Sequence, residues 1–298
     1  MTAANVEVAI ATPARLGECP VWAAAERVLY WTDIESQVLH RFDPETGVDA
    51  TRGFPGRVGT VALGAGRGQL VIAVENTLYR YDWNEPARFE FVAELEPDGN
   101  GNRSNDGRVD PNGRFVLGTM FEDPVARRST GSLYRVDADG PSALRTDVGI
   151  PNGLAFDPSR DRVYWADTFT DMVIVADYDL DTGAWSDERP FFDYTDHPGH
   201  PDGACLDADG GYWSASVGGS CVTRIDPDGT VSERIELPLA KPSMPAFGGA
   251  DLGTLFVTTI GDEGGRPAAR GPDGELPGSL LAITGTGATG VAEPPVRF

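Results

Sequence analysis

The sequence predicts a six-bladed β-propeller, an all-β fold in which four-stranded antiparallel blades surround a central channel. One strand pattern recurs six times at intervals of about 42 to 49 residues, which is the length of a propeller blade. Glycine and proline are abundant, at 37 and 23 of 298 residues, as short strands joined by tight turns require. We therefore expect residues 1–298 to form one propeller domain.

Each repeat has an apolar strand, a short turn and a second strand, and in the first five repeats the second strand ends in aspartate before a turn. The first strands contain the equivalent residues Val28, Leu70, Phe115, Val163, Tyr212 and Leu255. The ring is expected to close by pairing of residues 7–10 with the last blade, in which residues 261–274 form an irregular insertion. A β-sandwich with similar turns is the alternative, and six regular intervals favour the propeller.

Charge and cysteine content narrow the class of protein. The formal net charge of -22 argues against nucleic acid or an anionic membrane as a partner. The three cysteines, Cys19, Cys205 and Cys221, provide no disulfide framework and fit a reducing compartment. The first residues lack the pattern of a signal peptide, and no apolar run approaches about 18 residues. We expect a cytoplasmic protein without a membrane partner, either a monomer or a weak dimer.

Three oxygen-bearing side chains occupy equivalent places in three repeats. Glu18, Asn152 and Asp202 each lie in a predicted turn just before an innermost strand, on blades one, four and five. Innermost strands line the channel of a propeller, so these side chains are expected to converge there. Two carboxylates and an amide oxygen suit calcium, magnesium or manganese, and zinc or iron(II) is also compatible. Asn105, entering blade three, would supply a fourth oxygen.

The same residues have an ordinary alternative interpretation. A single Pro-Asn-Gly or Pro-Asp-Gly segment is usually only a β-turn, and a lone glutamate after glycine is usually a solvated turn residue. Their equivalent positions in three repeats, whose other copies lack the acid, favour a metal site.

Longer segments carry a family resemblance. They follow one another along nearly the whole chain: Leu16–Trp22, Arg103–Met120, Gly131–Arg135, Pro151–Phe156, Pro201–Gly203 and Lys241–Gly249. With these segments the chain resembles the senescence-marker/gluconolactonase/luciferin-regenerating-enzyme family, which includes regucalcin and bacterial sugar lactonases. The resemblance implies a six-bladed propeller with one divalent metal ion held by Glu18, Asn152 and Asp202.

The resemblance also implies substrate contacts. Arg103 and Asn105 match residues that contact substrate in the family, and the acidic residue that faces substrate in regucalcin-like members falls at Glu122 or Asp123. The chain departs from the family at Cys19, where glycine is usual, and this places a thiol beside a metal ligand. Residues 103–108 resemble bacterial pentono- and hexonolactonases, such as arabinolactonases, more than animal regucalcin.

These residues predict hydrolysis of a sugar lactone to the aldonic acid, with a pentono- or hexonolactone such as L-arabinonolactone or gluconolactone as substrate. A bound cation polarises the carbonyl, and Asp202 accepts the proton of the attacking water. Arg103 orients the substrate, or instead forms a salt bridge to Asp106 or Glu122. The alternatives are a lactone isomerase, a phosphotriesterase, and a calcium-binding propeller without turnover. Arg103 and Asn105 favour a polyhydroxylated ligand over an apolar organophosphate.

Other conspicuous residues are expected to be structural. Cys205 is interpreted as a small buried apolar residue, because no histidine is clearly placed to activate it. His200 is expected to be an exposed loop residue, with proton shuttling at the rim as the alternative. Four tryptophans are expected to pack within the blades: Trp22, Trp31, Trp165 and Trp213.

Overall fold

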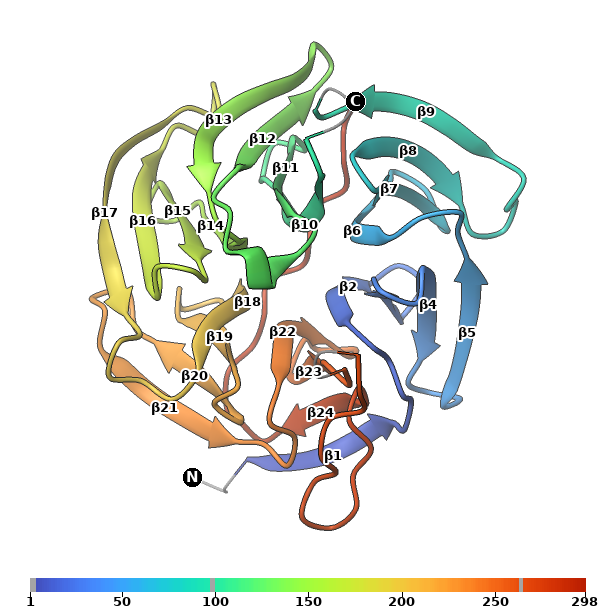
Figure 1. Ribbon diagram of the computed structural model, residues 1–298, viewed down its shortest axis with the longest axis vertical. Coiled ribbons are helices and arrows are strands. Elements are labelled where there is room, and N and C mark those ends of the chain that lie inside the picture. The colour runs from blue at the N-terminus through green and yellow to red at the C-terminus, as the bar shows by residue number, and fades with distance from the viewer. Residues whose placement is uncertain (1–3, 97–99, 263–264) are drawn as a thin grey trace.

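The computed structural model describes residues 4–96, 100–262 and 265–298. Over these ranges the chain forms six four-stranded antiparallel sheets arranged in a ring (Figure 1). The helical content of the same ranges is one 3-10 turn, η1 (Pro124–Ala126). Within these ranges no helix has the length and apolar character needed to span a membrane. The predicted six-bladed β-propeller is confirmed.

Each blade runs from an innermost strand at the channel to an outermost strand at the rim. The first three blades contain β2 (Gly17–Ala23), β3 (Val28–Asp33), β4 (Val38–Asp43) and β5 (Val48–Gly53); β6 (Val58–Leu63), β7 (Gln69–Val74), β8 (Thr77–Asp82) and β9 (Phe89–Glu94); and β10 (Asn102–Val109), β11 (Phe115–Phe121), β12 (Gly131–Asp137) and β13 (Gly140–Val148). Consecutive strands pair as hairpins, so each repeat of the sequence forms one blade.

The remaining blades follow the same order until the last one. They contain β14 (Pro151–Asp157), β15 (Arg162–Asp167), β16 (Met172–Tyr178) and β17 (Trp185–Asp193); β18 (His200–Leu206), β19 (Tyr212–Val217), β20 (Cys221–Ile225) and β21 (Val231–Glu236); and β22 (Pro242–Gly248), β23 (Thr254–Thr259), β24 (Leu280–Thr284) and the N-terminal β1 (Asn5–Ile10). The last blade therefore takes its outermost strand from the other end of the chain.

The ring closes through this shared blade. Strand β1 pairs antiparallel with β24, with Val6 opposite Ile283 and Val8 opposite Leu281. The predicted closure is confirmed. The innermost strands β2, β6, β10, β14, β18 and β22 each contact the next one around the ring, so they form a continuous wall about the channel (Figure 1).

A β-bulge interrupts the innermost strands at a common level. The pairing register shifts between Glu18 and Val21 in β2, and in the corresponding parts of β10, β14 and β18. An unpaired bulge residue bends its strand and redirects its side chain. The expectation that Glu18, Asn152 and Asp202 lie in turns before the strands was wrong, because each lies inside an innermost strand, at its bulge. The Pro and Gly neighbours that indicated a turn belong to these bulges.

Apolar side chains between adjacent blades form the core. Val21, Tyr30 and Leu39 of blade one pack with Val61 and Ile72 of blade two, for example. The four tryptophans predicted to pack within blades are buried, with at most 4% of each residue exposed: Trp22, Trp31, Trp165 and Trp213. That prediction is confirmed.

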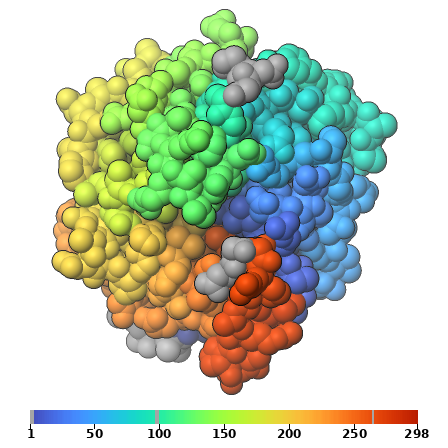
Figure 2. Space-filling model, viewed as in Figure 1, coloured from blue at the N-terminus to red at the C-terminus, as the bar shows by residue number. Residues whose placement is uncertain are grey.

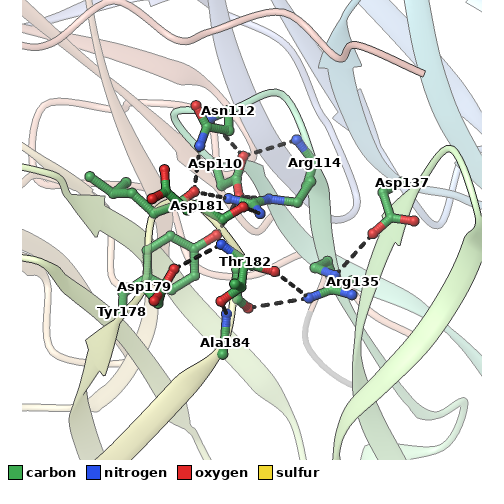
Figure 3. A network of polar contacts seen from close by, with 12 residues as sticks. Asp110, Asn112, Arg114, Arg135, Asp137, Tyr178, Asp179, Asp181, Thr182 and Ala184 are labelled. Carbon is green, nitrogen blue, oxygen red and sulfur yellow. Dashed lines mark hydrogen bonds and ion pairs between the residues drawn. The ribbon is translucent and has the colours of Figure 1, made fainter.

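Polar contacts join blades three and four at the end of the innermost strands that lies away from the bulges (Figure 3). The carboxylate of Asp110, buried after β10, accepts hydrogen bonds from the guanidinium of Arg114 and the hydroxyl of Tyr178. Arg114 also donates to the Asp181 carbonyl oxygen at 3.0 Å, and Arg135 donates to the Thr182 carbonyl oxygen at 2.9 Å. Charge-assisted hydrogen bonds of this kind hold the two blades in register.

We expect Gly59→Ala to reduce the free energy of unfolding by about 1–3 kcal/mol, because overpacking a close backbone contact forces the blades apart. A Cβ at Gly59 would lie 2.4 Å from the carbonyl oxygen of Ser104 on the next blade. Urea unfolding measures the change. Gly53→Ala is the matched control, since no described atom lies within 4 Å of a Cβ there. Equal stability of the two variants would contradict the prediction.

Candidate metal centre

The structure places the three predicted ligands at one level of the channel wall. Glu18 lies on β2, Asn152 on β14 and Asp202 on β18, and each is buried, with 7%, 4% and 6% of the residue exposed. Asn105 lies at the bulge of β10, the blade next to that of Asn152. Glu18 and Asn152 are the last paired residues before their bulges, whereas Asp202 and Asn105 lie within theirs.

The Asn152 side chain is held in one orientation by its neighbours. The Thr168 hydroxyl donates to the Pro201 carbonyl oxygen at 2.8 Å, so it accepts from Asn152 Nδ2, at 2.9 Å. Asn152 Oδ1 is thereby turned the other way, where Asn105 Nδ2 donates to it at 2.9 Å. A carbonyl oxygen has two lone pairs, so Asn152 Oδ1 retains one for a further partner.

The two carboxylates are electrostatically unfavourable in the absence of a cation. Burial, followed by the nearby carboxylates of Asp202 and Asp106, raises the pKa of Glu18 well above its ordinary value. Burial and then Asp106 likewise raise the pKa of Asp202. Buried like charges disfavour joint ionisation, and a cation between them removes that penalty.

Asp106 is a third buried carboxylate in the channel, with 3% of the residue exposed. Its Oδ2 accepts from the Leu154 backbone N–H at 3.1 Å. Among the described residues, its Oδ1 has no hydrogen-bond partner. Burial raises the pKa of Asp106, although the Arg108 guanidinium opposes this. A buried carboxylate oxygen without a partner is costly, and Asp106 adds a negative charge that acts on the two acids.

Cys19 follows Glu18 in the bulge and has a left-handed backbone, with φ of 47°. Gly153, the residue after Asn152, has φ of 64°. Glycine adopts a left-handed backbone conformation without steric cost. This explains why glycine would suit the position that Cys19 occupies. The Cys19 thiol is directed to the Gly59 carbonyl oxygen at 3.2 Å, and burial raises its pKa well above the ordinary value. Cys19 is therefore a protonated, buried thiol.

Arg103 brings a positive charge to this end of the channel. Its Nη1 donates to Asn105 Oδ1 at 2.9 Å and to the Ser104 carbonyl oxygen at 2.8 Å. Burial, and then the nearby Arg57 guanidinium, lower its pKa. Among the described residues, Arg103 forms no ion pair and its Nε has no hydrogen-bond partner. The alternative of a salt bridge to Asp106 or Glu122 is not observed, and the guanidinium retains hydrogen-bonding capacity.

Glu122 and Asp123 have different environments on the segment that leads to η1. Glu122 Oε2 accepts from Arg57 Nη2 at 3.1 Å, across the boundary between blades two and three. Asp123 Oδ1 accepts from the Val125 backbone N–H at 3.0 Å and caps η1. This segment lies near the centre of the ring on the face seen in Figure 2, in green.

His200 and Cys205 have the surroundings expected for structural residues. His200 is exposed at the start of β18, and its Nδ1 lies 2.5 Å from Asp171 Oδ1. Cys205 is buried, and burial raises its pKa to about 12. A thiol with this pKa is protonated at neutral pH and is a poor nucleophile.

The donor set is chemically suited to a hard divalent cation. In the described part of the chain, no three His, Cys, Asp or Glu side chains converge closely enough to hold a metal ion. The candidate centre instead combines two carboxylates, from Glu18 and Asp202, with the oriented amide oxygen of Asn152. Oxygen ligands of mixed charge are those that calcium and magnesium prefer. The fold and site thus define a class: a six-bladed propeller with an acidic, amide-containing centre at one mouth of its channel.

The chain belongs to the SMP-30/gluconolactonase/LRE-like family. Residues 16–261 match the region that defines this family, which confirms the resemblance inferred from the sequence. The match includes every residue of the candidate centre, from Glu18 to Asp202.

Curated relatives and solved structures agree with this assignment. The chain is 38% identical to a 6-deoxy-6-sulfogluconolactonase of Pseudomonas putida, over 97% of this chain and 98% of the relative. It is 38% identical to pentonolactonase XacC of Haloferax volcanii, over 91% of each. The crystal structure of a calcium-binding protein, regucalcin, from Agrobacterium tumefaciens superposes with a TM-score of 0.89 at 31% identity, covering 98% of this chain and 97% of that one.

Sequence reasoning did not assign three neighbours of the centre their roles. Thr168 orients Asn152, Arg57 holds Glu122, and Asp106 adds a buried charge. Thr168 and Arg57 belong to no recognisable motif, because their roles depend on contacts between strands or blades. Asp106 had a signal, since it is the second residue of a bulge whose first residue, Asn105, was already a candidate.

Proposed function

We propose that this chain hydrolyses an aldonolactone to the aldonic acid, with one divalent cation held by Glu18, Asn152 and Asp202. The observation that carries the proposal is the buried Glu18–Asp202 pair, whose pKa values are raised, beside an Asn152 amide that is held in one orientation. A bound cation supplies Lewis-acid polarisation of the lactone carbonyl. The sequence-based expectation of an enzyme for sugar-lactone hydrolysis is confirmed by lactonase relatives at 38% identity.

Asp202 is proposed as the general base. A water molecule adds to the carbonyl carbon and transfers a proton to the Asp202 carboxylate. The ring C–O bond then breaks as the Asp202 carboxyl passes this proton to the leaving ring oxygen, which regenerates the carboxylate. General-base assistance contributes about 10²–10⁴-fold to such a reaction. The strand position of Asp202 fixes its direction, since its backbone is part of β18.

Arg103 and Asn105 are proposed to bind and orient the sugar. Arg103 is positioned by Asn105 Oδ1 and has an unused Nε–H, so it suits the ring oxygen or hydroxyl groups of a lactone. Asn105 donates to Asn152 Oδ1 and accepts from Arg103, so we propose that it positions these two residues besides contacting the sugar, and that it is not the fourth metal ligand considered from the sequence. Of the two acids after β11, we propose that Glu122 contacts substrate, because Asp123 caps η1.

The relatives indicate the substrate class and the cation to test first. The names of the two lactonases point to hexonic and pentonic lactones, including one with an anionic C6 substituent. The regucalcin of Agrobacterium tumefaciens is described as a calcium-binding protein. We propose a pentono- or hexonolactone as substrate, and calcium as the first cation to examine, followed by magnesium, manganese, zinc and iron(II).

Proton release from arabinono-, xylono-, glucono- and galactonolactone in weak buffer tests the function. Chelator-treated protein is expected to match the spontaneous rate, and protein reloaded with each cation in turn is expected to exceed it. The substrate with the highest kcat/KM identifies the lactone. Hydrolysis is ruled out if no reloaded sample exceeds the spontaneous rate on any of the four. Metal dependence is ruled out if the chelated sample is fully active.

A further inference from the structure

The C-terminal residues 288–298, here called the C-terminal strap, cross the end of the channel opposite the candidate metal centre. Backbone hydrogen bonds link the strap to Ala208 and Leu252 at one side and to Leu63 and Gly113 at the other. These partners belong to blades five, six, two and three. In Figure 1 the strap is the red coil behind the middle of the ring. It therefore passes across the axis, independently of the β1–β24 closure.

The strap places one carboxylate at the base of the channel. Glu293 Oε1 accepts from Arg108 Nη1 at 2.8 Å, and Arg108 is buried, with 4% of the residue exposed. The pair adjoins a cavity of about 250 Å³ with mainly apolar walls, including Phe156, Phe247 and Val291. Because the Arg108 side chain is buried and the Glu293 side chain is 23% exposed, solvent screens this ion pair only in part.

Arg108 is held in place by more than Glu293. Its Nη2 donates to the carbonyl oxygens of Ala204, at 2.8 Å, and Pro245, at 3.4 Å. Ala204 lies on β18, two residues after Asp202. Loss of the Glu293 charge would therefore leave the guanidinium in place, as a positive charge without its ion-pair partner.

The charges of the channel form a sequence along its axis. Glu18 and Asp202 lie at the candidate centre, and each is influenced by the Asp106 carboxylate. Asp106 is influenced in turn by Arg108. Although burial alone would lower the pKa of Arg108, Glu293 and then Asp106 raise it. Asp106 lies two residues before Arg108 on β10, so the Arg108 charge acts on it from the base side of the strand, and its Oδ1 has no partner among the described residues.

We propose that Glu293 of the C-terminal strap is a positioning residue that sets the cation affinity of the metal centre by neutralising Arg108. The guanidinium and a cation at Glu18 and Asp202 repel each other and are both attracted to Asp106. The negative charge of Glu293 offsets this repulsion without contacting the cation. The inference rests on the cation site of the proposed function, and it assigns to the strap a role in that site.

Calcium titration by isothermal calorimetry on the full-length, metal-stripped protein tests the proposal. Glu293→Gln preserves a hydrogen-bond acceptor for Arg108 and removes only the charge. It is expected to raise the Kd for Ca²⁺ about 10-fold, within the range known for residues that support metal ligands indirectly. Arg108→Met is expected to lower the Kd. The double variant restores the net charge and is expected to bind within about 3-fold of wild type.

The opposite signs distinguish this electrostatic role from a structural one. If the pair only stabilised the fold, both single variants would weaken binding and the double variant would bind no better than either. Glu26→Gln is the matched control, since Glu26, in the turn between β2 and β3, forms an ion pair with Arg41 of blade one at 3.3 Å. It is expected to change the melting temperature without changing the Kd.

Two outcomes overturn the inference. A Kd for Glu293→Gln within 2-fold of wild type would show that the strap charge does not reach the centre, and weaker binding by both single variants would show a structural role. Wild-type protein that binds no Ca²⁺ would overturn the calcium site and this inference together. Lactone hydrolysis is measured separately by proton release, so failure of the inference and failure of the proposed activity give different results.

Discussion

Replacing Asp202 with asparagine is expected to lower kcat/KM for the best aldonolactone by about 10³-fold or more. The substitution keeps the size of the side chain, but it removes both a negative charge at the cation and the proposed proton acceptor. Loss of a general base alone costs about 10²–10⁴-fold. Steady-state kinetics by proton release, with cation at saturating concentration, measures the effect.

Asp207→Asn is the control for this variant. Asp207 is also a buried aspartate of blade five, but it accepts hydrogen bonds from Trp213 Nε1 at 2.8 Å and Arg224 Nε at 2.6 Å. Its replacement is expected to lower stability and to leave kcat/KM within a few-fold of wild type. Calorimetry on the Asp202 variant shows whether it still binds Ca²⁺, and a low kcat with the cation bound would identify Asp202 as the base. Retention of more than a tenth of the wild-type kcat/KM would contradict the assignment.

Removal of divalent cations is expected to abolish activity and to lower the melting temperature, and the decrease is expected to be larger at pH 8 than at pH 5. Burial and neighbouring carboxylates raise the pKa of Glu18 and of Asp202 in the folded protein. The unfolded chain releases these protons at lower pH. The cation-free fold is therefore most stable below the ordinary carboxyl pKa range, and it loses stability as pH rises towards the raised values.

A bound cation reverses this trend, because it interacts with the ionised carboxylates. At a concentration of 100 times Kd, ligand binding stabilises a fold by about 2.7 kcal/mol. In a chain of this size that corresponds to a rise of roughly 5 °C in melting temperature.

Differential scanning calorimetry at pH 5, 6.5 and 8, with chelator and with excess Ca²⁺, measures this difference. The Glu18→Gln/Asp202→Asn double variant is the control and is expected to show no Ca²⁺-dependent shift at any pH. A shift in wild type that is equal at all three pH values, or larger at pH 5, would contradict the argument. It would indicate that the cation stabilises the protein at another place.

The fold was predictable because its signals are local and repeated. The pattern around Val28 recurs near Leu70, Phe115 and Val163, and one blade-length interval repeated six times permits few architectures. The ring closure through β1 was also predictable, since the last blade lacked a strand and residues 7–10 supplied one. The positions of the ligands within the strands were not predicted. A bulge and a turn contain the same residue types, and only pairing with the next strand distinguishes them.

The candidate centre was predictable to a similar depth. Their equivalent positions in three repeats predicted that Glu18, Asn152 and Asp202 converge at the channel. The structure places all three at the level of the bulges in the channel wall. The partners that orient them were not predictable. Thr168 reaches Asn152, and Arg57 reaches Glu122 across a blade boundary, through contacts that leave no regular spacing in the sequence.

The propeller, the family and the oxygen-rich composition of the centre could be predicted from the residues alone, because these properties reside in repeated segments and in residue types. The tertiary structure alone decided the orientation of the Asn152 amide, the position of Asp106 and the contact between Arg108 and Glu293. Arg108 and Glu293 are 185 residues apart in the chain. Their contact arises because the strap crosses the channel axis. The charge balance at the base of the channel therefore depends on a segment that is distant in the sequence.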